Sequence, residues 1–309
     1  MTGIHRGATV KMAARLGMVS EGGDEMAENN NRAAKSKFTL AADTYARPGW
    51  WLTPEPDHAP QLAQFAPISL DQMAGVALLD RMETKFVFHE RQLDSILQNL
   101  TDAYRVLQVN DSRLNHYRTL YFDTPDFALF RRHQAGGRNR FKVRSRSYLD
   151  TDLAFLEIKH KVKKNRTVKN RIKTANFVDR LSPRATDFLN TYLPSGLWPL
   201  EPKLWNEYTR ITLVGIHNPE RVTIDLNLQF RAGDQTIILP GVVIAEVKNS
   251  GADRDSAFIR LMSAGKLRAT GFSKYCVGVS MLYPEVQHSR FKPNLKMVSK
   301  LIQEEKYYV

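Results

Sequence analysis

The segment GRNRFKVRSRSYLD, residues 137–150, has a cationic side chain at every second position. These cations are Arg138, Arg140, Lys142, Arg144 and Arg146. Successive side chains of a β-strand point to opposite faces, so this spacing predicts a strand with its cations on one face and Phe141 and Val143 on the other. Like charges repel at such short spacing. The cationic face therefore predicts a large anionic ligand.

Composition agrees with an anionic partner. The chain of 309 residues has a formal net charge of +13 and a sequence pI near 9.8. Nucleic acid, a phosphorylated small molecule, polyphosphate or an anionic membrane surface would each satisfy this charge. The hydrophobic fraction of 42% is sufficient for a packed core. The single cysteine, Cys276, excludes an internal disulfide framework and a cysteine-based zinc cluster.

Three regions can be distinguished along the chain. Residues 1–66 are polar and then proline-rich, and they predict a flexible N-terminal arm. Residues 67–287 read as strands with a few helices, and residues 288–309 form a C-terminal tail with a helical pattern. We find no apolar run of about 18 residues and no secretory signal, so we expect a soluble, cytoplasmic protein without a transmembrane segment.

Strand-like alternation recurs well beyond residues 137–150. It is seen in RMETKFVF (81–88), FLEIKHKVK (155–163), YTRITL (208–213), RVTIDLNLQF (221–230) and VVIAEVKN (242–249). Each strand alone fits ordinary half-burial, with polar residues toward water. Together, however, their polar faces repeat acid-x-lysine and arginine-x-arginine pairs. This repetition predicts a closed antiparallel sheet with a polar, cationic interior and apolar faces covered by helices.

Such an interior suits phosphate chains. Guanidinium groups bind phosphate oxygens bidentately, and lysines add point charge. The few carboxylates on the same faces predict a divalent cation held jointly by glutamates and substrate phosphates. No P-loop motif is present, so phosphate handling must use another fold. Nucleic-acid binding usually brings exposed aromatic residues together with a surface basic patch; here the cations alternate with core positions and acids share their face, which disfavours it.

The order of these segments resembles a known family. RMETKF, YRTLYFDTPDFALFRR, RFKVRSRSY, FLEIKHK, YTRITL, RVTIDLNL, IAEVKN and FSKYCVG follow one another as in the VTC domain, over roughly residues 70–285. This domain is the polyphosphate polymerase module of vacuolar transporter chaperone complexes and belongs to the CYTH, or triphosphate tunnel metalloenzyme, superfamily. The resemblance implies an α+β fold: an antiparallel β-barrel tunnel with helices packed around it.

The resemblance also implies a function and a set of site residues. The function is transfer of the ATP γ-phosphate to a growing polyphosphate chain with Mn²⁺ or Mg²⁺. The implied catalytic residues are Lys85, Arg144, Arg146, Lys159, Arg210 and Lys274. The implied substrate-binding residues are Arg140, Lys142, Lys161, Lys248 and Tyr275, and the implied metal ligands are Glu83, Glu157 and Glu246. ATP and inorganic polyphosphate are the expected partners. If the product is exported, a separate membrane partner is expected, which would place the protein at the inner membrane.

Two alternatives to polymerisation stay open. Arg81 stands where the superfamily's triphosphatases have a further carboxylate, which favours the polymerase branch but permits hydrolysis by a triphosphatase. A non-catalytic polyphosphate-binding module is the other alternative. Asp225 fits a metal ligand and an ion-pair partner equally well. The charge run of Lys161, Lys163, Lys164, Arg166 and Lys169 predicts a solvated rim, or a guide for a polyanion leaving the tunnel.

Overall fold

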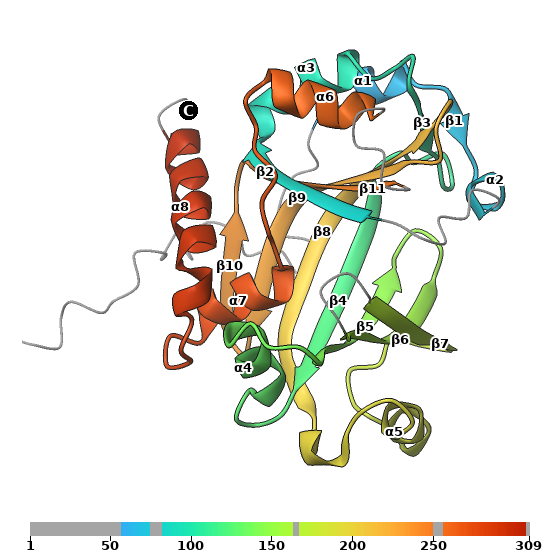
Figure 1. Ribbon diagram of the computed structural model, residues 1–309. Coiled ribbons are helices and arrows are strands. Elements are labelled where there is room, and N and C mark those ends of the chain that lie inside the picture. The colour runs from blue at the N-terminus through green and yellow to red at the C-terminus, as the bar shows by residue number, and fades with distance from the viewer. Residues whose placement is uncertain (1–56, 75–81, 163–166, 250–255, 307–309) are drawn as a thin grey trace, which may run out of the picture. The chain divides into compact units, whose positions relative to one another are not determined.

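The computed structural model describes residues 57–74, 82–162, 167–249 and 256–306 (Figure 1). Most of the predicted arm, together with Arg81 and the charge-run residues Lys163, Lys164 and Arg166, lies outside these described residues. Within them, no helix is long and apolar enough to cross a membrane.

Eleven strands of the described part form one sheet. They are β1 (Pro67–Ile68), β2 (Met82–His89), β3 (Tyr104–Leu107), β4 (Asn115–Asp123), β5 (Arg140–Tyr148), β6 (Leu153–Lys161), β7 (Thr167–Thr174), β8 (Glu201–Gly215), β9 (Arg221–Ala232), β10 (Gln235–Leu239) and β11 (Val242–Asn249). The main path runs β2-β11-β9-β8-β4-β5-β6-β7, with β10 beside β9 and β3 beside β8. All pairs are antiparallel except β1 with β3. The predicted α+β class with a large antiparallel sheet is confirmed.

Short helices flank this sheet. They are α1 (Ala59–Ala63), α2 (Leu70–Ala74), α3 (Leu93–Gln98), α4 (Ala128–Gln134), α5 (Pro183–Asn190), α6 (Ala257–Ala264), α7 (Lys274–Leu282) and α8 (Lys292–Lys306), with 3₁₀ turns η1 (Glu90–Gln92), η2 (Ser195–Leu197) and η4 (Ser289–Phe291). Serine side chains begin three of these helices. Ser182, Ser256 and Ser273 each accept a hydrogen bond from a backbone N–H in the first turn, which satisfies a donor that has no partner within the helix.

The apolar side of each strand makes the core. On β5 and β6, Phe141, Val143, Leu156 and Ile158 are buried and form one cluster with Leu189 of α5. A second cluster lies where α3 and α6 cover the apolar side of β2, β8, β9 and β11. The alternation of residues 140–147 therefore decides the orientation of every side chain in β5. Its apolar positions enter the core and its cations take the opposite face.

The N-terminal boundary differs from the prediction. The sequence predicts a flexible arm that includes residues 57–66, yet these residues contain α1, and Leu62 and Phe65 are buried in the cluster under α3 and α6. Arg113 donates to the carbonyl oxygens of Leu62 and Phe65, at 3.2 Å for the latter. The prediction of an arm up to residue 66 is thus wrong for these residues. Two buried apolar side chains in a proline-rich stretch gave too little periodicity to identify a packed helix.

Helix α7 lies on the side of the sheet that bears the cations, whereas helices were expected only around the outside. Its Tyr275 and Val279 pack with Tyr208 of β8 and Ile244 of β11, which share a face with the charged residues of those strands. The helix predicted in the C-terminal tail is present as α8, and its Val298 joins the same cluster. α7 therefore fills one part of the charged face with apolar side chains.

The sheet curves strongly. β2 begins the main path, and five strands separate it from β6. Even so, the Lys159 Nζ of β6 is 3.4 Å from the Glu83 Oε2 of β2. Within the described residues no backbone ladder joins β2 to β6 or β7, so this contact between β2 and the strand next to the far end of the path is made by side chains.

Candidate functional site: a curved cationic face

Cross-strand pairing assembles the charged residues on one side of the sheet. Directly opposite pairs join Lys85 with Glu246, Glu83 with Lys248, Arg210 with Asp225 and Arg144 with Glu157. Directly opposite residues of paired strands point to the same face. We call the result the cationic face. Its cations include Lys85, Arg140, Lys142, Arg144, Arg146, Lys159, Lys161, Lys169, Arg210, Lys248 and Lys274, with Arg171, Lys173 and Arg221 on the same side of their strands, and its acids are Glu83, Glu157, Asp225 and Glu246 among the described residues.

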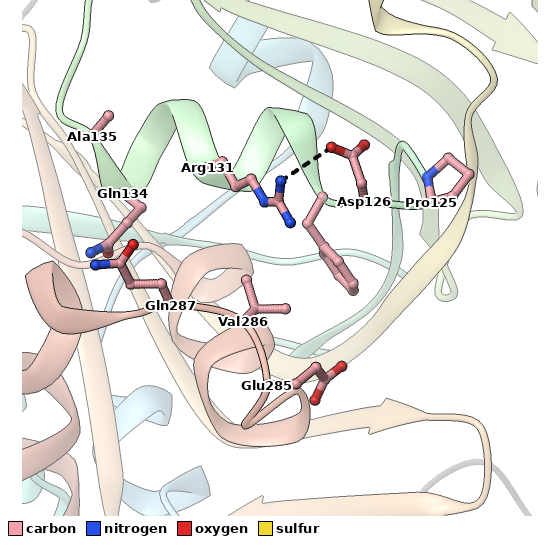
Figure 2. A pocket seen from close by; sticks show the side chains of 9 residues that line it. Pro125, Asp126, Arg131, Gln134, Ala135, Glu285, Val286 and Gln287 are labelled. Atoms are coloured by element: carbon pink, nitrogen blue, oxygen red, sulfur yellow. Dashed lines mark hydrogen bonds and ion pairs between the residues drawn. The ribbon is translucent and has the colours of Figure 1, made fainter.

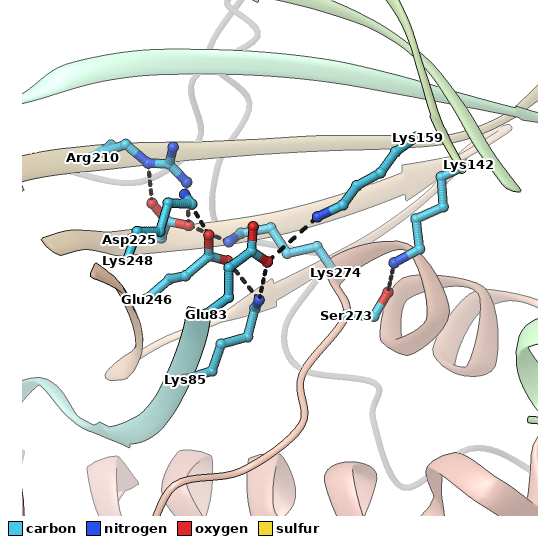
Figure 3. Close-up of polar contacts among 10 residues, drawn as sticks. All are labelled: Glu83, Lys85, Lys142, Lys159, Arg210, Asp225, Glu246, Lys248, Ser273 and Lys274. Atoms are coloured by element: carbon cyan, nitrogen blue, oxygen red, sulfur yellow. Dashed lines mark hydrogen bonds and ion pairs between the residues drawn. The ribbon is translucent and has the colours of Figure 1, made fainter. Parts of the chain in front are cut away.

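Two of the acids, Glu83 and Glu246, converge on one lysine (Figure 3). The Lys85 Nζ lies 2.6 Å from Glu246 Oε2 and 3.6 Å from Glu83 Oε2, while Lys248 pairs with Glu246 Oε1. Burial alone would raise the pKa of Glu246, but Lys248 and Lys85 hold that pKa well below its usual value. The pKa of Lys85 is correspondingly raised by Glu246, against the effect of burial. Burial and Glu246 would raise the pKa of Glu83, but Lys159 and Lys85 lower it, so both carboxylates are ionised at neutral pH.

The third acid, Glu157, lies apart from this pair. It is 1% exposed, and its carboxylate accepts from Arg144 Nε at 2.7 Å and pairs with Lys169. Burial would raise the pKa of Glu157, but Arg144, Arg146 and Lys169 together lower it far below its ordinary value. Lys169, for which the sequence predicts a solvated rim or a guide for a polyanion, is an exposed residue, and its ammonium also pairs with this buried carboxylate. Burial lowers the pKa of Lys169 to about 8 in spite of that partner.

Two cations of the face form no ion pair with a carboxylate among the described residues. Arg146 is buried, with Nε 3.4 Å from Thr119 Oγ1 and its guanidinium 5.7 Å from the centre of the Tyr117 ring. Lys142 Nζ donates to Ser273 Oγ at 2.8 Å. Among the described residues, no carboxylate lies within ion-pair distance of either. Burial lowers the pKa of Lys142 to about 8, and Lys159 acts in the same direction.

The fourth acid, Asp225, is bound by two cations. Arg210 donates to it through Nε and Nη2, at 2.5 and 2.8 Å, and Lys274 donates from the first turn of α7. Burial would raise the pKa of Asp225, but Arg210 and Lys274 lower it to about 2. Of the two roles that the sequence left open, the structure shows the ion-pair partner. The Lys274 ammonium also lies 4.6 Å from the centre of the Tyr208 ring.

Tyr275 was expected to bind substrate, but its hydroxyl does not point to the other residues of the cationic face. The residue is 1% exposed, and its hydroxyl donates to the buried carboxylate of Asp123. Asp123 also accepts the backbone N–H groups of Leu129 and Phe130 at 2.8 Å. This contact ties α7 to α4 and so fixes the end of α7 that carries Lys274. These contacts support a structural role for Tyr275, and we do not include it among the proposed substrate-binding residues.

The remaining predicted residues are at the border of the face. Arg140 and Lys161 lie opposite each other on β5 and β6, in line with Lys142 and Lys159. Arg138 precedes β5 and is exposed, so the strand places four of the five alternating cations on the face. Figure 2 shows a separate pocket of about 670 Å³ between α4 and the segment after α7, where Arg131 and Asp126 form an ion pair. None of the residues lining that pocket belongs to the cationic face.

A family comparison agrees with this geometry. The family model for the VTC domain matches residues 80–283, which include every strand of the cationic face. The chain belongs to the VTC domain family. A search of curated protein sequences found no significant match.

Solved structures similar to this VTC domain have low sequence identity. A putative adenylate cyclase from Vibrio parahaemolyticus is 14% identical, with a TM-score of 0.40, and the alignment covers 63% of this chain and 95% of that one. A putative adenylyl cyclase from Hippeastrum, described as having a dominant triphosphatase activity, is 12% identical, with a TM-score of 0.39 and coverage of 64% and 96%. PH1012 from Pyrococcus horikoshii is 11% identical, with a TM-score of 0.38 and coverage of 65% and 98%.

The donor set of this VTC domain fits a divalent metal only in part. Glu83 and Glu246 contact the same ammonium, so the two carboxylates are neighbours on the face. Glu157, predicted as a third ligand, is instead held by Arg144 and Lys169. Among the described residues there is no group of three or more metal-ligating side chains. Two carboxylates suit Mg²⁺ or Mn²⁺ when phosphate oxygens and water complete the coordination.

Several residues of the site were not identified from the sequence. Ser273 caps α7 and also accepts a hydrogen bond from Lys142, and both contacts are seen only in the structure. Tyr117 and Tyr208 stack at 5.2 Å between ring centres, with Arg210 over both rings. The alternation of YTRITL places Tyr208 and Arg210 on one face, so this signal was available. The partner strand of Tyr117 could not be read from the sequence.

Proposed function

We propose that this VTC domain is a metal-dependent polyphosphate polymerase, which transfers the γ-phosphate of ATP to a growing polyphosphate chain. Buried Arg146, without a carboxylate partner, is the observation that supports this most directly. A buried charge is costly unless it is paired, so this site favours an anionic ligand. The surplus of cations over acids on the same face favours a ligand with several negative charges rather than a single phosphate.

The curved sheet gives such a ligand a path. Because Lys159 of β6 meets Glu83 of β2, we propose that the sheet encloses a tunnel with the cationic face as its lining. Arg144 and Arg146 would bind phosphate oxygens through their guanidinium forks. Lys142, together with Ser273 at the start of α7, would bind a neighbouring phosphate, since helix N-termini favour anions.

The transfer step needs positioning more than acid–base chemistry. A terminal oxygen of the polyphosphate acceptor attacks the γ-phosphorus, the bond from this phosphorus to the β,γ-bridging oxygen breaks, and ADP leaves with that oxygen. The acceptor oxygen is already ionised, so no proton has to be removed. Arg144, Arg146 and Lys159 would hold donor and acceptor in line and balance the charge that develops on the oxygens. Glu83 and Glu246 would hold the divalent metal, which supplies further charge neutralisation when bound.

Product analysis with matched variants tests the proposal. Purified protein is incubated with ATP and Mn²⁺, with and without a short polyphosphate primer, and the products are resolved on a polyphosphate-stained gel beside a free-phosphate assay. We expect polymer from the wild type and at least a hundredfold less from Arg144→Ala and Glu246→Ala, the range typical of lost electrostatic stabilisation. Arg231→Ala is the control, because Arg231 is exposed and stacks on Trp205, outside the cationic face.

The alternatives give different products. Free phosphate without polymer would show a triphosphatase that uses the same cations with water as acceptor. Tight primer binding without either product would show a polyphosphate-binding module. Polymer from both variants at the wild-type rate would show that the chemistry lies elsewhere in the chain.

A further inference from the structure

The carboxylates available for a metal are already neutralised by lysines of the chain itself. Glu246 has one oxygen on Lys248 and the other 2.6 Å from Lys85 Nζ. Glu83 Oε2 lies 3.6 Å from Lys85 and 3.4 Å from Lys159 (Figure 3). Two carboxylates thus share three ammonium groups. The three lysines come from β2, β6 and β11, so strands from both ends of the sheet path contribute.

We propose that Lys85, Lys159 and Lys248 occupy the place of a divalent cation, and that this acid pair binds metal only together with a polyphosphate that takes over these lysines. This inference rests on the proposed function for the identity of the polyanion. A free metal ion approaching Glu83 and Glu246 meets a cluster that is already net positive. Charges a few ångströms apart interact strongly where water is partly excluded, so the lysines oppose binding of a bare cation.

A phosphate chain removes this opposition. Its oxygens offer the three ammonium groups new partners, and the carboxylates are then free for the metal. The exchange requires only side-chain motion, since a lysine ammonium sits on a flexible four-carbon stem. The side chains of Lys85, Lys159 and Lys248 are 23%, 38% and 18% exposed, so each can turn toward the open side of the face.

The other acids are not equivalent to this pair. Asp225 is held by a two-pronged contact from Arg210 as well as by Lys274, and Glu157 is held by Arg144. A guanidinium keeps its fixed fork geometry and is less easily displaced than an ammonium. Glu83 and Glu246 instead contact the ammonium groups of Lys85, Lys159 and Lys248, so this pair is the better suited to exchange a lysine for a metal.

Binding of free Mn²⁺ tests the proposal without any turnover. The full chain is titrated with Mn²⁺ in phosphate-free buffer, and unbound Mn²⁺ is followed by electron paramagnetic resonance. We expect no tight binding by the wild type, and at least tenfold tighter binding by Lys248→Gln. Lys248→Arg keeps the charge and should stay weak. Lys173→Gln is the control, because Lys173 lies on β7 with no carboxylate within ion-pair distance in the described part of the chain.

A second arm measures tripolyphosphate binding by calorimetry, with excess Mn²⁺ or with a chelator. The metal complex of tripolyphosphate has two fewer negative charges than the free anion. A face that only attracts anions would bind the metal complex more weakly than metal-free tripolyphosphate. The lysine exchange instead predicts that the metal complex binds at least tenfold more tightly than metal-free tripolyphosphate. By thermodynamic reciprocity, the metal and the polyanion raise each other's affinity by the same factor.

Three results would overturn the proposal: micromolar binding of free Mn²⁺ by the wild type, no gain in Lys248→Gln, or weaker tripolyphosphate binding with Mn²⁺. If Lys248→Gln does not fold, as judged by circular dichroism, Lys85→Gln serves as the second variant with the same expectation. Neither readout involves polymer, so a failure of the polymerase proposal would leave this test intact, and the reverse also holds.

Discussion

Replacing Glu157 by glutamine would test whether the cationic face is held together by its buried acids. The carboxylate is 1% exposed and contacts Arg144 at 2.7 Å and Lys169. Glu157→Gln keeps the shape of the side chain but leaves both cations without their counterion. Breaking a fully buried ion pair costs about 3–5 kcal/mol. Here the partners are 18% and 34% exposed, so water solvates them in part and we expect about 2–3 kcal/mol.

Urea denaturation at neutral pH, followed by tryptophan fluorescence, measures this loss. Glu201→Gln is the matched control: its carboxylate is 47% exposed beside Lys203, and we expect at most about 0.5 kcal/mol. Adding tripolyphosphate should stabilise Glu157→Gln more than the wild type, because the anion replaces the missing charge. A loss no larger than that of the control would refute the view that Glu157 stabilises the face.

The difference in unfolding free energy between the wild type and Glu157→Gln should depend on pH in a definite direction. The pKa of Glu157 is lower in the folded protein than in the unfolded chain, because Arg144, Arg146 and Lys169 outweigh the effect of burial. The stability that Glu157 contributes is therefore present above the unfolded pKa of about 4.3 and is lost as the pH falls toward the folded value. The difference between wild type and variant should shrink below about pH 4. A difference that is constant with pH would contradict this.

Three further predictions follow from other contacts. Arg146→Met removes a buried charge that forms no ion pair with a carboxylate, so we expect unchanged or higher thermal stability without ligand. Calorimetry should show at least tenfold weaker binding of tripolyphosphate. Lower thermal stability with normal tripolyphosphate binding would contradict this prediction. His58 lies between Glu90 and Asp94, at 3.0 and 2.6 Å, and its pKa is raised because these acids outweigh burial. Its stabilising effect is present below the unfolded pKa of about 6.5 and is lost as the pH rises through the folded pKa. An equal difference in unfolding free energy between wild type and His58→Gln at low and high pH would disprove this. Gly278→Ala would place a methyl group 2.6 and 2.8 Å from a leucine and a phenylalanine side chain of the sheet, so chemical denaturation should show a loss of about 1–3 kcal/mol.

Strand positions and faces could be predicted because they depend on local alternation. The segment around β5 is the clearest case: Arg140, Lys142, Arg144 and Arg146 lie on one face and Phe141 on the other. A side-chain period of two leaves a half-buried strand only one orientation toward the core. The same reasoning placed Glu83 with Lys85 and Glu246 with Lys248. The resemblance of these segments to the VTC domain then indicated that the charged faces of the strands point to one common interior.

Contacts between distant segments could not be predicted in this way. Glu157 has the same acid-x-lysine spacing as Glu246, yet only pairing with β5 and β7 shows that it neutralises Arg144 and Lys169. Tyr275 follows Lys274 directly, but a helix turns successive side chains by about 100°, and this turn directs its hydroxyl to Asp123. Burial of α1 likewise depends on a surface made by α3 and α6. Such contacts depend on tertiary packing rather than on local pattern.

Polymerisation itself is best tested by following ATP consumption with phosphorus nuclear magnetic resonance, which separates internal polyphosphate, terminal phosphate, ADP and free phosphate in one sample. With Mg²⁺ in place of paramagnetic Mn²⁺, a polymerase should form one new phosphoanhydride linkage for each ADP, with internal polyphosphate signals rising as ATP falls. Arg144→Ala should show neither signal change. ADP accompanied by an equal amount of free phosphate, with no internal signal, would contradict the polymerase proposal and show hydrolysis instead.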